Sequence, residues 1–446
     1  MPEYPNILYI HSHDSGRYLQ PYGHPVETPN LQKLAERGVL FRKAFCAGPT
    51  CSPSRAALLT GQSPHSAGMM GLAHRGWRLN DYSQHLLHTL RPHGYTSCLA
   101  GFQHIAKPPF AEVEQIGHDI DLRTNWGDDD WANNACRFIE DRPSEPFFMD
   151  VGFTRTHAPF PEATREDDPR YVMPPAPIPD HPDTRRTWAG YRTLARHLDR
   201  TVGQVLDTLE RSGLARRTLV ISTTDHGIAL PDMKCNLTDH GLGVSLIMAG
   251  PREFSGGKVV DGMVSQIDVF PTLCDWLDIE IPDWVEGRSV MPLVRGEREQ
   301  VNEEICGEVT YHASYEPKRA VRTERWKYIR RFDSRTVPNL PNCDNSATKQ
   351  HWLDRGWAGR EVEREMLFDL EFDPQERRNL AADPRQAGTL SEMRGRLDAW
   401  MERTDDPLRL GPVIMPKGGI ANDPDELHPS PGGATVDWRP PDTTTG

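Results

Sequence analysis

The segment Cys51-Ser52-Pro53-Ser54-Arg55 places a thiol and a guanidinium close together in the chain. Pro53, just inside a helix start and followed by an apolar run, predicts that Cys51 lies at or before the helix N-terminus. The backbone N–H groups and the helix dipole favour an anion there, and Arg55, about one turn further on, can hold a tetrahedral oxyanion. Two interpretations of Cys51 stay open: a nucleophilic thiolate of lowered pKa, or a buried structural cysteine.

Histidine and aspartate side chains follow four predicted strands, over residues 6–10, 97–100, 147–153 and 219–223. Functional groups of open parallel sheets gather just beyond the carboxyl ends of the strands, so we expect these side chains to share one cleft. They are His13 and Asp14 after the first strand, His104 after the second, His157 after the third, and Asp225 and His226 after the fourth.

Asp14 and Asp225, flanked by His13 and His226, have the ligand types of a divalent metal site. Two carboxylates and up to two imidazoles suit Mn, Zn or Fe better than Ca, which prefers oxygen ligands alone. The alternative is that Asp14 caps a loop and that the histidines are ordinary polar residues. Spacing alone leaves both interpretations open.

The elements that must position these residues change in character along the chain. Residues 1–300 alternate short apolar runs with helical patterns, which predicts βα units and a mostly parallel sheet flanked by helices. Residues 301–410 predict a smaller α+β unit with an antiparallel sheet, and residues 411–446, rich in Pro, Gly and Asp, predict an extended arm or a disordered tail. Other predicted elements are helices over 29–37, 188–212 and 384–404 and strands over 244–248, 319–323, 326–329 and 366–370.

Composition excludes several classes of function. The 446 residues include 51 Lys and Arg against 64 Asp and Glu, a net charge of −13, which argues against nucleic-acid binding. We find neither a signal-peptide pattern nor an apolar run long enough to span a bilayer, and the eight cysteines form no CxxC pair. These features predict a cytoplasmic protein with reduced thiols and no membrane contact.

Several motifs resemble one known family. Cys51-Ser52-Pro53-Ser54-Arg55, followed by Leu59-Thr60-Gly61, resembles the signature of the type I sulfatases, whose cysteine is oxidised to formylglycine after translation. Further segments resemble the family's motifs in order: residues 5–8, 28–31, 224–227, 233–237, 268–273 and 367–370. The resemblance implies an alkaline phosphatase-like α/β fold with a smaller C-terminal α+β subdomain.

The same resemblance implies a role for each site residue. Cys51 becomes the formylglycine nucleophile, Arg55 stabilises it, and His104 is the base that regenerates the aldehyde. Lys234 and His157 contact the sulfate and protonate the leaving atom. The metal ligands are His13, Asp14, Cys51, Asp225 and His226, and the substrate contacts are Gln103, His74 and His240. For His74 and His240, an exposed loop position and a turn position are the alternatives.

Three positions depart from the family pattern. His13 and His226 stand where most sulfatases have oxygen ligands, which favours Mn²⁺ or another transition metal over Ca²⁺, the family default. The Asp225-His226 pair resembles phosphonate monoester hydrolases and phosphodiesterases. Phe102 replaces a lysine of the family motif, and Gln103 is expected to substitute in part as a neutral donor.

The sequence therefore predicts a metal-dependent sulfatase that cleaves a sulfate ester or sulfamate. Residues 310–317 resemble the heparan N-sulfatase branch, which implies a sugar substrate. The acidic surface favours a small anionic molecule over a long polyanion. A formylglycine-generating enzyme is the implied partner, and a homo-oligomer stays open. The alternatives are a phosphonate monoester hydrolase or phosphodiesterase with the same site, and a non-catalytic sulfate- or sugar-binding protein.

Overall fold

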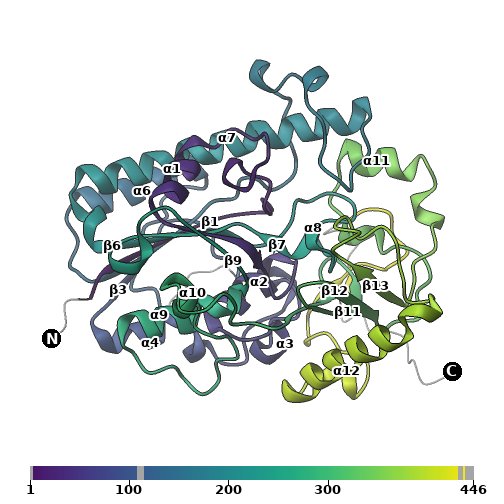
Figure 1. Cartoon of the computed structure of the whole chain (residues 1–446). Helices are drawn as coiled ribbons and strands as arrows, with labels where there is room; N and C mark the ends of the chain where they lie inside the picture. The colour runs from purple at the N-terminus through teal and green to yellow at the C-terminus, as the bar shows by residue number, and fades with distance from the viewer. Residues whose placement is uncertain (1–3, 108–114, 430–434, 437–446) are drawn as a thin grey trace.

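A nine-stranded sheet runs through the larger part of the computed structural model, which describes residues 4–107, 115–429 and 435–436 (Figure 1). Its strands lie in the order β4-β3-β5-β1-β6-β8-β2-β7, with β9 beside β2. Their bounds are β1 Asn6–Ser12, β2 Val39–Phe45, β3 Thr96–Leu99, β4 Ile120–Asp121, β5 Phe147–Gly152, β6 Thr218–Thr224, β7 Gly243–Val244, β8 Leu246–Ala249 and β9 Lys258–Ser265.

The central strand β1 pairs in parallel with both β5 and β6. All three strands are buried along their whole length, as is usual for a parallel sheet covered on both faces. Their carboxyl ends therefore meet at one edge of the sheet, where the predicted site residues follow. The mostly parallel sheet expected from the sequence is confirmed.

The strand predicted over residues 244–248 is wrong as a single element. The backbone N–H of Ser245 donates to the carbonyl of Gly16 at 2.9 Å and so leaves the ladder. Two short strands result, and both β7 and β8 pair antiparallel with β2.

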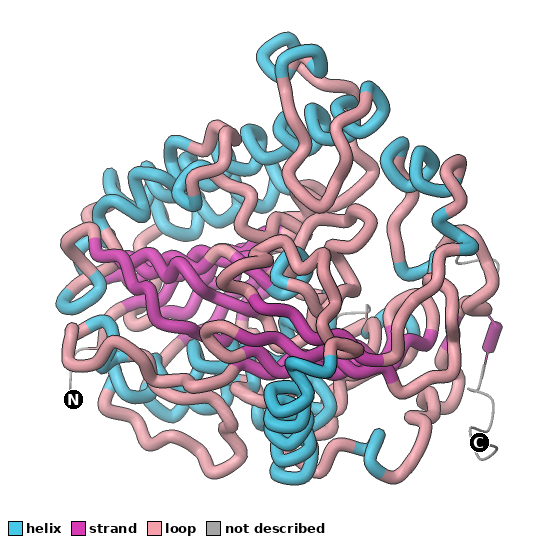
Figure 2. Tube along the Cα trace, turned by 45° about the vertical axis from the view of Figure 1, so that its right-hand side comes forward, coloured by secondary structure: helices cyan, strands magenta, loops and turns pink. Residues whose placement is uncertain are grey.

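Helices cover both faces of the sheet (Figure 2). Alternate residues of β1 point to opposite sides, so Leu8 and Ile10 join one hydrophobic core, and Ile7 and Tyr9 the other. The first core is closed by α1 Pro29–Arg37, α6 Asp128–Glu140 and α7 Pro182–Arg211. The second is closed by α2 Cys51–Thr60, α4 Leu86–Leu90, α9 Val269–Leu277 and α10 Met291–Val294. The short helices α3 Pro64–Ala67 and α8 Asp239–Leu242 lie in connecting segments.

A four-stranded antiparallel sheet forms the smaller unit, in the order β10-β11-β12-β13. Its strands are β10 Ile305–Tyr311, β11 Tyr315–Arg322, β12 Trp326–Arg331 and β13 Glu365–Asp369. Helix α12 Ala387–Arg403 packs on β11 and β12, whereas α11 Ala347–Leu353 packs on α7. Tyr328 and the half-buried Trp326 pack into its core, as expected for the small sheet. The predicted α+β unit is thus confirmed.

Part of the predicted C-terminal arm folds back onto this unit. Asn422 follows β14 Ile420–Ala421, which pairs with β15 Thr435–Val436, and its backbone N–H donates to the carbonyl of Ala313 at 2.8 Å. The remainder of the arm, 430–434 and 437–446, lies outside the described residues. Within the described part of the chain, we find no helix long and apolar enough to cross a membrane.

Candidate functional site

Five side chains with metal-binding atoms converge at the carboxyl edge of the main sheet. His13 and Asp14 follow β1, Asp225 and His226 follow β6, and Cys51 begins α2. One ligand atom of each lies within 4.8 Å of the others, and all five residues are buried. The shortest approaches are His13 Nδ1 to Asp14 Oδ1 at 2.8 Å and to Asp225 Oδ2 at 3.1 Å. The structure thus brings together the five residues that the sequence nominates as metal ligands; we call them the five-residue cluster.

Charged neighbours decide the protonation of this cluster. Burial alone would raise the pKa values of Asp14 and Asp225, but cationic neighbours hold both well below the ordinary value. The largest such contribution comes from Lys234 at Asp14 and, at Asp225, from His13, which is protonated in the acidic range where that carboxylate titrates. Burial lowers the pKa of His13 to about 4, against the opposing pull of the two carboxylates. Two ionised carboxylates beside a neutral imidazole form a donor set that fits a divalent metal ion.

Cys51 lies at the first position of α2, whose ten residues are all buried. Its Sγ is 3.5 Å from Nε2 of His226. Burial raises the pKa of the Cys51 thiol well above its ordinary value, and Asp14 and Asp225 add to this effect against Lys234 and Arg55. Without a bound cation the thiol is protonated at neutral pH, which contradicts the interpretation of Cys51 as a thiolate of lowered pKa.

Arg55 is held by groups on both sides of its guanidinium. Nη2 donates to Oδ2 of Asp225 at 2.9 Å and to the carbonyl of Ser12 at 3.1 Å. Nη1 contacts Nδ1 of His11, whose Nε2 lies 2.8 Å from Oδ1 of Asp150. His11 on β1 therefore connects Arg55 to a buried carboxylate on β5. Asp150 gave no signal in the sequence because it lies inside an apolar strand.

Lys234 links the five-residue cluster to the smaller unit. Its buried Nζ lies 3.1 Å from Oδ2 of Asp14, 3.0 Å from Oδ2 of Asp344 and 3.4 Å from Nε2 of His157. Sequence reasoning missed Asp344, which stands in a polar loop between β12 and α11 without a motif of its own. Lys234 and His157 are thus adjacent, as the prediction that both contact the sulfate requires.

His104 and His74 form a pair beside the cluster. Nδ1 of His74 lies 2.9 Å from Nε2 of His104, and the two rings are nearly parallel, with centroids 5.1 Å apart. Burial and the neighbouring His74 hold the pKa of His104 well below its ordinary value, so its imidazole is neutral. Among the described residues, its buried Nδ1 has no hydrogen-bond partner. A neutral imidazole with a free nitrogen can accept a proton.

Gln103 does not point toward the cluster. Its Oε1 accepts from the backbone N–H groups of Ile105 and Ala106, and its Nε2 donates to the carbonyl of Ala106 at 2.9 Å. The side chain therefore closes its own loop, contrary to the expectation that it replaces the missing lysine as a donor.

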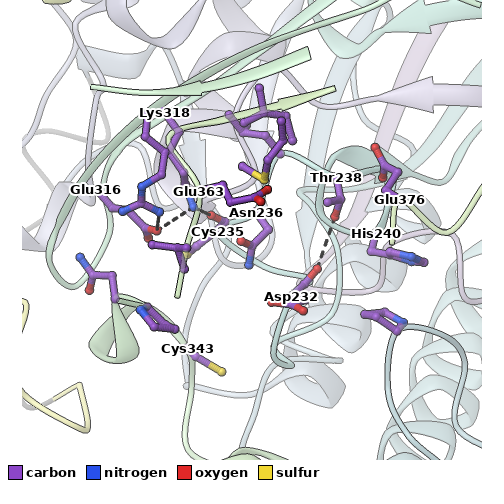
Figure 3. A pocket seen from close by; sticks show the side chains of 18 of the residues that line it. Asp232, Cys235, Asn236, Thr238, His240, Glu316, Lys318, Cys343, Glu363 and Glu376 are labelled. Atoms are coloured by element: carbon purple, nitrogen blue, oxygen red, sulfur yellow. Dashed lines mark hydrogen bonds and ion pairs between the residues drawn. The ribbon is translucent and has the colours of Figure 1, made fainter. Parts of the chain in front are cut away.

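A cavity of about 570 Å³ lies between residues 230–240 and the smaller sheet (Figure 3). Its lining is strongly charged and includes Asp232, Glu316, Lys318 and Glu376. His240 lines this cavity and contacts the hydroxyl of Tyr18 at 3.0 Å, and none of its described contacts is with the five-residue cluster. His240 thus shares this cavity with Lys234, and none of its described contacts is with His74 or Gln103.

Comparison with known families agrees with this geometry. The Sulfatase family model matches residues 5–279, and the model for the C-terminal part of N-sulphoglucosamine sulphohydrolase matches residues 233–349. The chain belongs to the sulfatase family. The recognition made from its motifs and the predicted enzyme class, a sulfuric ester hydrolase, are confirmed.

Curated relatives of this sulfatase include N-sulphoglucosamine sulphohydrolase from Homo sapiens, 29% identical, with 90% of this chain and 91% of the relative covered. A Delta 4,5-hexuronate-2-O-sulfatase from Bacteroides thetaiotaomicron is 26% identical, with 91% of both covered. Among solved structures, a 2-O GAG sulfatase superposes with a TM-score of 0.69 at 23% identity, with 92% and 94% of the two chains covered. This structural likeness shows that the two chains share one fold.

Phe102 occupies the position of the missing lysine in this sulfatase. Its ring centroid lies 5.6 Å from Cζ of Arg55 and 5.2 Å from the ring of His13. The exposed Trp126 meets the Phe102 ring edge-on at 6.1 Å. Aromatic side chains thus lie beside the guanidinium of Arg55, where the family motif has a lysine. In the described part of the chain, the buried cations that contact the five-residue cluster are therefore Arg55 and Lys234.

Proposed function

We propose that this sulfatase cleaves a sulfate ester or a sulfamate of a small sugar through a formylglycine formed from Cys51. One observation carries the proposal: Sγ of Cys51 lies within the five-residue cluster at the N-terminus of α2, with Lys234 and His157 beside Asp14. The names of the relatives support a sugar as the substrate, since they include enzymes that act on N-sulphoglucosamine and on a hexuronate 2-O-sulfate.

The donor set of the cluster fits one divalent metal, held by His13, Asp14, Asp225 and His226 together with the side chain derived from Cys51. When bound, such an ion would supply Lewis-acid chemistry, polarising the sulfate and lowering the pKa of the hydroxyl nucleophile. The two imidazoles favour Mn²⁺ or another transition metal over Ca²⁺. Elemental analysis tests this, and stoichiometric calcium without a transition metal contradicts it.

Arg55 positions the nucleophile, and Lys234, His157 and His104 transfer the protons. Arg55, fixed by Asp225, orients the hydrated formylglycine and stabilises its negative charge as it attacks sulfur. Lys234 or His157 protonates the leaving oxygen or nitrogen. His104 then removes a proton from the second hydroxyl, so that sulfate is expelled and the aldehyde is regenerated.

Mass spectrometry of the Cys51 peptide tests the nucleophile. Protein made together with a formylglycine-generating enzyme is expected to carry the aldehyde at Cys51 and to turn over an aryl sulfate, whereas Cys51→Ala does neither. An unmodified Cys51 thiol in such a preparation would contradict the proposed formylglycine mechanism. Inactivity toward sulfates of a modified, folded protein would instead favour the non-catalytic binding alternative.

The phosphonate monoester and phosphodiester alternative is not favoured, because the matching family and its curated members similar to this chain are sulfatases. Rates for an aryl sulfate, an aryl phosphonate and a phosphodiester, measured on one preparation, compare the two activities directly. A higher kcat/KM for the phosphonate than for the sulfate reverses this preference. A cytoplasmic location, maturation by a formylglycine-generating enzyme and a small anionic substrate complete the proposal.

A further inference from the structure

A second group of metal-binding atoms lies at the start of α7, outside the five-residue cluster. It consists of His181, which precedes α7, Asp183 in the first turn of α7, and His351 on α11. One ligand atom of each lies within 4.8 Å of the others. The three residues come from distant parts of the sequence that are brought together because α11 packs on α7.

The distances within this group are those of ligands around a common ion. Nδ1 of His181 lies 3.3 Å, and Nδ1 of His351 lies 3.7 Å, from the same oxygen, Oδ2 of Asp183. Hydrogen bonds between an imidazole and a carboxylate are shorter, at about 2.7–2.9 Å. Ligands placed tetrahedrally at about 2.0–2.1 Å from a zinc ion are about 3.4 Å apart, close to both separations.

An unpartnered buried nitrogen points to a missing ligand. His351 is only 5% exposed, and its Nδ1 has no hydrogen-bond partner among the described residues. The other oxygen of Asp183 contacts Arg186, which leaves Oδ2 to face the two rings. Nδ1 of His181 accepts a long bond, 3.3 Å, from the backbone N–H of Asp183, which a metal ion would replace. His181 and Asp183 are half-buried, so water can complete the coordination.

We propose that His181, Asp183 and His351 bind a second divalent metal ion, of the zinc type, that joins α7 to α11. Two imidazoles and one carboxylate suit zinc, with water as the fourth ligand. The observations that support this second site do not depend on the function proposed above.

Such an ion would also hold Asp344, which lies near the five-residue cluster, in position. Lys349 on α11 donates from Nζ to the carbonyls of Leu340 at 2.9 Å and Cys343 at 2.7 Å. The loop so held carries Asp344, which pairs with Lys234 at 3.0 Å. Anchoring α11 to α7 therefore keeps Asp344 in place against the lysine.

Zinc content tests the proposal on the full chain. Metal-free protein is loaded with Zn²⁺, freed of excess by gel filtration, and analysed by elemental analysis and by thermal unfolding. We expect His351→Gln to hold one zinc fewer per chain than wild type and to lose most of the rise in Tm on zinc addition. His197→Gln, a histidine substitution further along α7, is the matched control and should behave as wild type.

Equal zinc content in His351→Gln and His197→Gln would overturn the second site. If His351→Gln does not fold, zinc content is measured on His181→Gln instead, because the side chain of His181 is half-exposed. Zinc content equal to that of His197→Gln would again overturn the second site. Formylglycine content at Cys51 is expected to be unchanged in these variants, so failure of this proposal is distinguishable from failure of the proposed function.

Discussion

Replacing Lys234 by methionine removes a buried cation from the centre of the site while keeping most of its hydrocarbon stem. Nζ of Lys234 lies 3.1 Å from Asp14 and 3.0 Å from Asp344, so the variant leaves two carboxylates facing each other without their shared counter-charge. At an effective dielectric constant of about 20, each of these pairs interacts by roughly 5 kcal/mol before desolvation is counted.

Two consequences follow from that loss. Removing one partner of a buried ion pair costs about 3–5 kcal/mol of folding free energy, which thermal unfolding detects. Losing a positive charge aimed at the transition state lowers kcat by about 10²–10³. If Lys234 also protonates the leaving atom, the loss must grow as the leaving alcohol becomes more basic, since a weakly basic phenolate departs without help.

The assay measures kcat/KM for a series of aryl sulfates of increasing phenol pKa, with wild type and Lys234→Met. Lys327→Met is the matched control, because Nζ of Lys327 is also buried between two carboxylates, Asp239 and Glu376, outside the five-residue cluster. The control should lose stability but keep the leaving-group dependence of wild type. Equal losses across the series would refute the acid role, and kcat within threefold of wild type in folded Lys234→Met would refute any role in the transition state.

Three further predictions concern the base, the metal and the interface between the units. His104→Asn should release about one leaving group per site and then stall, with kcat reduced by about 10²–10⁴, because the covalent sulfate persists; a steady rate without this burst contradicts the role. Exhaustive chelation should abolish aryl sulfate turnover, and Mn²⁺ should restore it better than Ca²⁺; full activity of metal-free protein contradicts the metal site. Burial lowers the pKa of His65, but the neighbouring Glu308 carboxylate raises it by more, so the pKa lies above its ordinary value. The stability from this pair is therefore complete below about pH 6.5 and lost as pH rises through the raised pKa, so the gap in Tm between wild type and His65→Gln should shrink at alkaline pH.

Local signals in the sequence predicted that four residues of the five-residue cluster lie together, whereas their role as metal ligands with Cys51 was implied by the family resemblance. His13-Asp14 and Asp225-His226 come directly after apolar strands, and parallel strands bring their carboxyl ends to one edge. Pro53 marks the start of the helix that presents Cys51. Three of the four strands of the smaller sheet, β11, β12 and β13, were likewise predicted from the sequence, whereas β10 was not.

Strands with mixed polarity could not be predicted from local patterns. Charged residues interrupt β2 at Arg42 and Lys43, and β9 contains Lys258 and Asp261, so neither strand shows a continuous apolar run. Their place in the sheet follows from pairing with each other, through contacts between segments about 220 residues apart in the chain.

Only the tertiary structure decided which residues surround the cluster. Asp344 reaches Lys234 because α11 packs on α7, and His74 meets His104 across a gap of thirty residues. The direction of the Gln103 side chain was likewise set by the backbone N–H groups of its own loop. Sequence patterns record the local periods that build helices and strands, whereas these contacts arise from packing between distant segments, which leaves no period in the chain.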